Sequence, residues 1–78
     1  MKVKYVMFPE NRFIILPLNM SHDSVGMGVR PVSAGFVWLT TTEDGNCEAE
    51  VAGESVSLGI KSRPEDAKTI AWYFSTCK

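Results

Sequence analysis

The residues best suited to chemistry gather in one short segment, NMSHDSVGMGVRP, which lies within positions 19–33. It holds the only histidine of the chain, His22, followed by Asp23 and Ser24. A histidine oriented by a carboxylate beside a hydroxyl is the arrangement of a hydrolase, but neighbours in sequence rarely reach that geometry. Asn, Ser, Asp and Gly are also the residues of ordinary turns. The sequence therefore predicts an irregular loop over 19–33 and no catalytic residue.

The chain also lacks the spacing of a cofactor or metal site. Gly26 and Gly28 are a fragment of a phosphate-binding pattern, without its third glycine and without a strand before it or a helix after it. The two cysteines, Cys47 and Cys77, match no zinc module. We expect them to be thiols that pack as small apolar residues. The sequence predicts no metal and no cofactor.

Basic residues suggest a second class of function, the binding of a small ligand or an anion. Arg63 lies where a helix is predicted to begin, and a helix N-terminus with basic side chains is a plausible anion site. The 19–33 loop would add His22 and Arg30, because long loops in compact domains often carry function. The acidic residues that follow Arg63 favour a solvated polar face instead.

Composition predicts one small globular domain over residues 1–78. The chain is 45% hydrophobic and 22% charged, with a formal net charge of -1. This balance gives no electrostatic reason to expect nucleic acid or a membrane as partner. No stretch approaches the length of a spanning helix, and the N-terminus lacks the apolar core of a signal peptide. We therefore expect a cytoplasmic protein.

Alternating residues and turn signals predict two β-hairpins. Residues 2–8 and 13–18 flank the turn PENR, a spacing that pairs Tyr5 with Leu16. Residues 33–42 and 46–52 flank Asp44-Gly45, the strongest short hairpin signal in the chain.

A third strand is predicted to follow the second hairpin and complete a meander. A two-residue turn at Asp44-Gly45 pairs Trp38 with Val51, and a tight turn at Gly53-Glu54 pairs Val51 with Val56. Both turns place apolar residues on the same side of the sheet. Their agreement predicts one apolar face.

The last segment, 63–76, is predicted to be an amphipathic helix. Ser62 and Glu65 have the spacing of a capping box, and Pro64 suits a first turn. The spacing of four residues predicts a buried stripe: Ala67, Ile70, Ala71 and Phe74. Trp72 falls away from this stripe, so we expect it to point toward solvent or a partner.

These elements predict an α+β fold in which the C-terminal helix packs on an antiparallel sheet made of the N-terminal hairpin and the meander. The alternative is a five-stranded barrel of the SH3-like or OB-like kind with an appended helix, in which the hairpin folds over the meander and buries both of its faces.

Surplus apolar surface is the remaining functional signal. The predicted pairing places four apolar residues of the first hairpin on its outer face, and Trp72 stands apart from the helix stripe. Such surfaces on small proteins usually mark an interface. The sequence therefore predicts a non-enzymatic interaction module, a homodimer or a protein that binds another protein, with these interface candidates: Val6, Phe8, Phe13, Ile15 and Trp72.

Overall fold

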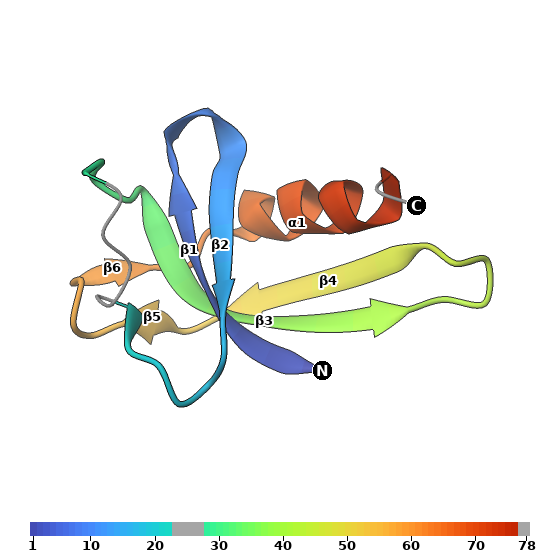
Figure 1. Ribbon diagram of the computed structural model, residues 1–78, viewed down its shortest axis with the longest axis horizontal. Coiled ribbons are helices and arrows are strands. Elements are labelled where there is room, and N and C mark those ends of the chain that lie inside the picture. Colours follow the sequence, from blue (N-terminus) through green and yellow to red (C-terminus); the bar gives the residue numbers. More distant parts are fainter. Residues whose placement is uncertain (23–27, 77–78) are drawn as a thin grey trace.

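The computed structural model describes residues 1–22 and 28–76. Its elements are β1 (Lys2–Phe8), β2 (Arg12–Leu16), β3 (Ser33–Thr41), β4 (Cys47–Ala52), β5 (Glu54–Ser55), β6 (Ile60–Lys61) and α1 (Pro64–Thr76). Strands β1 to β4 form an antiparallel sheet in the order β2-β1-β3-β4, while β5 and β6 form a small separate hairpin (Figure 1). The predicted α+β fold is thus confirmed. Within the described residues the strands do not close into the barrel that was its alternative.

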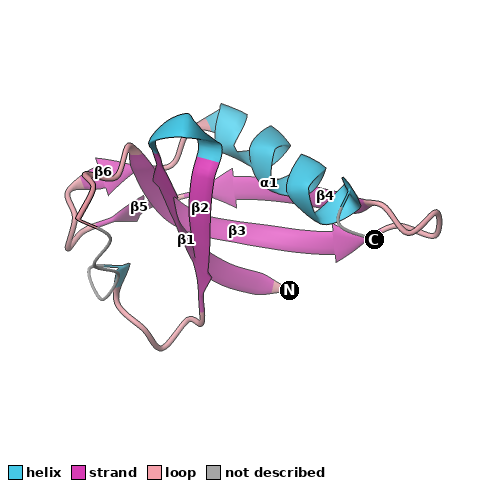
Figure 2. Cartoon of the chain, turned by 45° about the horizontal axis from the view of Figure 1, so that its top comes forward, coloured by secondary structure: helices cyan, strands magenta, loops and turns pink. Residues whose placement is uncertain are grey.

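Helix α1 covers one face of the four-stranded sheet, as Figure 2 shows. The core between them is built on Tyr5, Met7, Val37 and Ile70, all fully buried. No helix within the described residues is long and apolar enough to cross a membrane.

The opposite face of the sheet is covered by the segment that carries β5 and β6. Its side chains Leu58 and Ile60 pack against a second core, which contains Val6, Phe8 and Leu16. The sheet thus has a core on each of its faces, one covered by α1 and the other by the segment with β5 and β6. This explains how apolar residues are buried on both sides of the sheet.

The first hairpin differs from its predicted pairing by one residue. Tyr5 pairs with Ile15 rather than Leu16, because the connection Pro9–Asn11 is three residues long instead of four. Glu10 and Asn11 both adopt positive φ angles, 67° and 59°, and this left-handed conformation reverses the chain within fewer residues. A shift of one residue exchanges the two faces of a strand.

The second hairpin shows the same kind of shift. Val37, not Trp38, pairs with Val51, and Trp38 lies opposite Glu50. The connection is longer than the predicted two-residue turn, because the Thr42 N–H donates to the Asn46 carbonyl at 2.8 Å and so leaves residues 43–45 between the strands. As a result Val37 faces α1, and Trp38 lies on the opposite face of the sheet.

The third strand of the predicted meander is not formed, and the pairing of Val51 with Val56 is wrong. After β4 the chain turns at Gly53, whose φ of 79° is strained for any residue with a side chain. β5 then pairs with β6, not with β4. The Gly53 carbonyl accepts hydrogen bonds from the N–H and the hydroxyl of Ser62, at 3.0 and 2.9 Å. These bonds fix the point where the chain leaves the sheet.

The helix begins at Pro64, one residue later than predicted, and its capping box is not the predicted one. Ser62 donates its hydroxyl to Gly53, so it does not cap the helix. The carboxylate of Asp66 instead accepts a hydrogen bond from the Arg63 backbone N–H at 3.1 Å. In a capping box, the side chain of the third helical residue bonds in this way to the N–H of the residue just before the helix. Ile70 is buried and Trp72 is exposed, as the stripe predicts.

Candidate functional site

Helix α1 exposes three consecutive aromatic residues to solvent. Trp72 is 69% exposed, Tyr73 48% and Phe74 37%. A helix rotates by about 100° per residue, so a run of three aromatic residues cannot fit on a buried stripe. The sequence correctly predicted the exposure of Trp72, wrongly placed Phe74 on the buried stripe, and did not single out Tyr73. The run WYF itself was the signal that sequence reasoning missed.

Strand β2 completes this surface with one more ring. Phe13 contacts Tyr73 edge-on, with 5.3 Å between ring centroids, and lies 6.3 Å from the Phe74 ring. Tyr73 and Phe74 are themselves 5.4 Å apart and nearly perpendicular. Edge-to-face contacts at these distances are favourable, so they hold the rings in place. We refer to Phe13, Trp72, Tyr73 and Phe74 as the aromatic surface.

Two hollows lie side by side on the aromatic surface, because both are lined by Asn11, Phe13 and Tyr73. One has a volume of about 480 Å³ and reaches Lys68 and Trp72. The other has about 540 Å³, and its lining also includes Arg12, Ile15 and Phe74. Both hollows therefore combine aromatic walls with polar and basic side chains at the rim.

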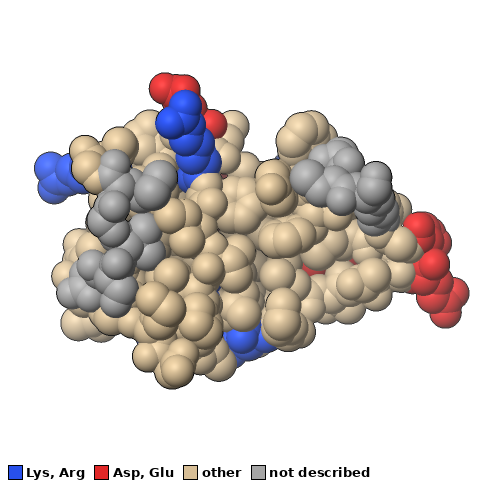
Figure 3. All heavy atoms as spheres, viewed as in Figure 1, with Lys and Arg blue, Asp and Glu red and all other residues tan. Residues whose placement is uncertain are grey.

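Charged side chains are sparse on the face that Figure 3 shows. They lie mostly around the outline, above the β1–β2 turn and beyond the β3–β4 turn. At the first of these turns Arg12 and Glu10 form an exposed ion pair of 3.8 Å. Such a pair contributes little stability.

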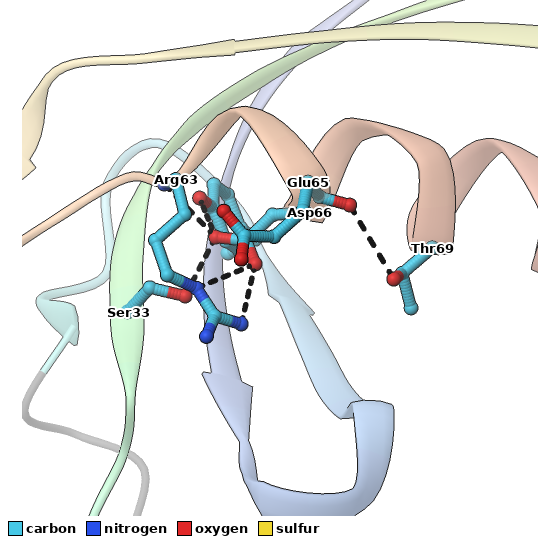
Figure 4. A network of polar contacts seen from close by, with 6 residues as sticks. Ser33, Arg63, Glu65, Asp66 and Thr69 are labelled. Carbon is cyan, nitrogen blue, oxygen red and sulfur yellow. Dashed lines mark hydrogen bonds and ion pairs between the residues drawn. The ribbon is translucent and has the colours of Figure 1, made fainter.

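A buried carboxylate fixes the start of α1 against the sheet. Asp66 is fully buried, and its Oδ2 accepts hydrogen bonds from the hydroxyls of Tyr5 and Ser33, both at 2.6 Å. Its Oδ1 accepts Nη2 of Arg63 at 2.8 Å and Nε at 3.1 Å. Figure 4 shows Ser33, from β3, and Arg63, from the chain just before α1, both pointing toward Asp66. The network thereby joins β1, β3 and α1.

The pKa values of this network follow from its geometry. Burial by itself raises the pKa of Asp66, but the hydrogen bonds from Ser33, Tyr5 and Arg63 outweigh it and hold the pKa below its usual value. Burial, and then the adjacent carboxylate, raises the pKa of Tyr5 well above its usual value. The hydrogen bond with Asp66 raises the pKa of Arg63. Asp66 is therefore a structural anion, neutralised by its own chain.

His22 is buried at the start of the 19–33 loop. Its Nε2 lies 2.9 Å from the Gly35 carbonyl, and because a carbonyl only accepts, Nε2 is the donor of this hydrogen bond. The ring also meets Phe36 edge-on at 5.9 Å. A shallow pocket of about 420 Å³ opens beside it and is lined by Lys4, Ser21, His22, Phe36, Glu54, Val56 and Ser57.

The three predicted ligand-binding residues do not converge. Arg63 is bonded to Asp66 and His22 to Gly35, while Arg30 is exposed. No hydrogen bond or ion pair joins any two of the three within the part of the chain that the structure describes. The basic helix start is therefore occupied by the chain's own carboxylate.

Two of the five interface candidates lie in the interior. Val6 and Phe8 are buried in the second core, 1% and 4% exposed, so the patch that the sequence predicted from them is not on the surface. The physical reason is the shifted register of the first hairpin, which turns Phe13 and Ile15 toward α1 and the other two away from it. Phe13 and Ile15 are half-buried beside the helix.

Several predicted features lie outside the described residues: Asp23, Ser24, Gly26 and Cys77. Among the described residues, Cys47 is a free thiol, and no group of three or more His, Cys, Asp or Glu side chains is placed to hold a metal ion.

No family model, curated protein or solved structure matches this chain.

Proposed function

We propose that this protein is a non-enzymatic protein-interaction module that forms a homodimer through the aromatic surface. The observation that carries the proposal is the run of three exposed rings on α1, Trp72, Tyr73 and Phe74. The last two of these rings contact Phe13 of β2. Tyr and Trp are enriched at interface centres because they bring large apolar area with few rotatable bonds.

The exposed area of these rings suits the centre of an interface. At about 200 Å² for a whole aromatic side chain, the exposed parts of the three helix rings amount to roughly 300 Å². Apolar patches of about 300–600 Å² on a small protein are often functional. A stable interface buries about 800 Å² on each partner, and the neighbouring β2 strand and the rim of the two hollows would supply the rest.

The interior polar groups support a binding role over an enzymatic one. Among the described residues, the groups whose pKa values are displaced are Asp66, which is buried, and Tyr5 and Arg63, which are both bonded to its carboxylate. Catalytic groups need access to a substrate as well as a displaced pKa.

Replacing Trp72 by serine is expected to weaken the dimer at least about tenfold, since an aromatic anchor at an interface centre contributes this much or more. Sedimentation equilibrium over a range of concentrations up to high micromolar measures the dissociation constant. The matched control is Trp38→Ser, because Trp38 is also partly exposed but lies on the opposite face of the sheet, beneath the Lys2 ammonium. This control is expected to dimerise as the wild type does.

Two outcomes contradict the proposal. A wild-type protein that stays monomeric at high micromolar concentration is not a homodimer. A dimer that Trp38→Ser weakens as much as Trp72→Ser does not use the aromatic surface.

A second candidate function, the binding of a small anion, is favoured by the pocket beside His22. Lys4 and His22 line it together with the hydroxyls of Ser21 and Ser57 and the carboxylate of Glu54. A cation with several donors is the chemistry that binds phosphate or carboxylate. Arg63 takes no part, because Asp66 already holds it.

Titration with inorganic phosphate, followed by amide chemical shifts, is expected to move His22 and Ser57 if the pocket binds anions. Arg63 serves as the reference, since it should not respond. A His22→Ala variant is expected to lose the response. Unchanged shifts at His22 and Ser57 at saturating phosphate, or equal shifts in the variant, would dismiss this candidate.

A further inference from the structure

The two edges of the four-stranded sheet are finished differently. At the β4 edge, the N–H of Cys47 donates to the Ser75 hydroxyl at 2.9 Å, and that hydroxyl lies 3.3 Å from the Cys47 carbonyl. Glu48 and Glu50 add exposed charges to the same strand. A helix side chain and charges are devices that block the pairing of an edge strand with another chain. β2 forms the other edge, and its sequence RFIIL carries one charge, at its first residue.

The free backbone groups of β2 can be deduced from the ladder. Met1 and Leu39 each donate a hydrogen bond to the carbonyl of the other, both at 2.8 Å. They are therefore a hydrogen-bonded pair of the β1–β3 ladder. In an antiparallel ladder bonded and non-bonded pairs alternate. The odd-numbered residues of β1 therefore bond to β3, and the even-numbered residues bond to β2. Their partners in β2 are Arg12, Ile14 and Leu16.

Phe13 and Ile15 therefore direct their N–H and C=O groups away from β1, toward the open edge. No hydrogen bond to these four groups is found within residues 1–22 and 28–76. The same deduction applied to β4 places the backbone N–H and C=O groups of Cys47 on the side away from β3, where the Ser75 hydroxyl bonds to them. That agreement supports the assignment on β2.

The geometry points to a second copy of this chain as the partner of β2, paired antiparallel to it about a two-fold axis at Ile14; this inference rests on the homodimer proposed above. Phe13 of each copy then lies opposite Ile15 of the other. The two residues of each copy offer two donors and two acceptors, so the pair forms four hydrogen bonds with no group left over. An isologous contact of this kind is self-complementary and closed.

The neighbouring residues confine the pairing to this segment. Asn11 has a left-handed φ of 59° that ends the extended chain, and Pro17 has no N–H, while its carbonyl accepts from Met20 at 3.1 Å. The side chains of Phe13 and Ile15 lie on the α1 side of the sheet. The two aromatic surfaces would thus lie on the same side of one eight-stranded sheet.

Amide hydrogen exchange tests the pairing directly. At protein concentrations where the dimer forms, exchange at Phe13 and Ile15 is expected to be at least tenfold slower than at concentrations where it is monomeric. Ile14, which bonds to β1, should be protected at both concentrations. Ala49 and Val51 are the matched controls, because the same alternation directs them outward from β4, and their exchange should not depend on concentration.

A variant gives an independent readout. Ile15→Pro removes an outward backbone N–H together with the isoleucine side chain and leaves both neighbouring bonds to β1, so the dimer should weaken at least tenfold. Ile15→Val keeps the N–H and should dimerise as the wild type does. If Ile15→Pro fails to fold, amide hydrogen exchange at Phe13 and Ile15 of the wild-type protein still tests the β2 pairing.

The outcomes separate the two proposals. A dimer in which Phe13 and Ile15 exchange at the monomer's rate overturns the β2 pairing and leaves the homodimer standing. A protein that is monomeric at every concentration overturns both.

Discussion

Replacing Asp66 by asparagine is expected to lower the free energy of unfolding by about 2 to 4 kcal/mol, because each buried donor left without its acceptor costs about 1 to 3 kcal/mol. The carboxylate accepts five hydrogen bonds, from Tyr5, Ser33 and Arg63. An amide has one acceptor oxygen and adds two donors, so several of these donors lose their partner in the interior. Urea denaturation followed by circular dichroism measures the loss. A chain of this size has only about 4 to 12 kcal/mol in total.

The pH dependence of stability supplies a second readout of the same variant. The pKa of Asp66 is lower in the folded than in the unfolded chain. Its contribution is therefore present above the unfolded value of about 3.9 and is lost as the pH falls through the folded pKa. Tyr5 has a raised pKa, so its contribution is full below about 10 and is lost as the pH rises beyond that value. Asp66 and Tyr5 therefore add no pH dependence of stability between these limits, and the Asp66→Asn variant should lack the acid decline that Asp66 causes.

The matched control for this change is Glu65→Gln. Glu65 is an exposed carboxylate in the same first turn of α1, and its replacement should change the free energy of unfolding by less than about 0.5 kcal/mol. Equal losses from Asp66→Asn and Glu65→Gln would contradict a stabilising role for the buried network.

Replacing Gly35 by alanine is expected to destabilise the protein by about 2 to 3 kcal/mol, toward the upper end of the cost of overpacking. A Cβ at this position would lie 2.8 Å from the Ala52 carbonyl oxygen and 3.0 Å from the Ser62 Cβ. β3 passes here beneath both the end of β4 and the chain entering α1, so backbone would have to move. Thermal unfolding measures the shift in midpoint.

Gly59→Ala separates steric overlap from backbone strain. Gly59 has a φ of 69°, but a Cβ there would meet no atom within 4 Å. Its replacement should therefore cost only the strain of a left-handed residue, about 1 to 2 kcal/mol. If Gly35→Ala were no more destabilising than Gly59→Ala, the close approach at Gly35 would not be rigid.

The sequence predicts the kinds of elements well and their exact pairing poorly. The helix and the four long strands follow from local patterns, the 3.6-residue stripe and the period-two alternation, which need no distant contact. Both hairpins are nevertheless shifted by one residue, because register depends on the length and conformation of the turn. At Glu10 and Asn11 the turn uses left-handed conformations that the residue types allow but do not require.

The candidate site divides in the same way. The exposure of Trp72 follows from helical geometry alone, so the sequence could predict it. The burial of Val6 and Phe8 could not be predicted, because it depends on which side of the sheet each strand residue occupies and on β5 and β6 covering the second face. The contact between Phe13 and Tyr73 joins residues 60 positions apart, and no local pattern encodes it.

By itself, then, the sequence determined where the chain is helical or extended, which side of the helix is apolar, and that one tryptophan lies off that side. Only the tertiary structure decided the strand register, the assignment of Asp66 as the buried partner of Tyr5 and Ser33, and the open edge at β2. The physical reason is range. Periodicity and turn propensity act over a few neighbouring residues, whereas pairing, burial and hydrogen-bond satisfaction are settled between segments that meet only when the chain has folded.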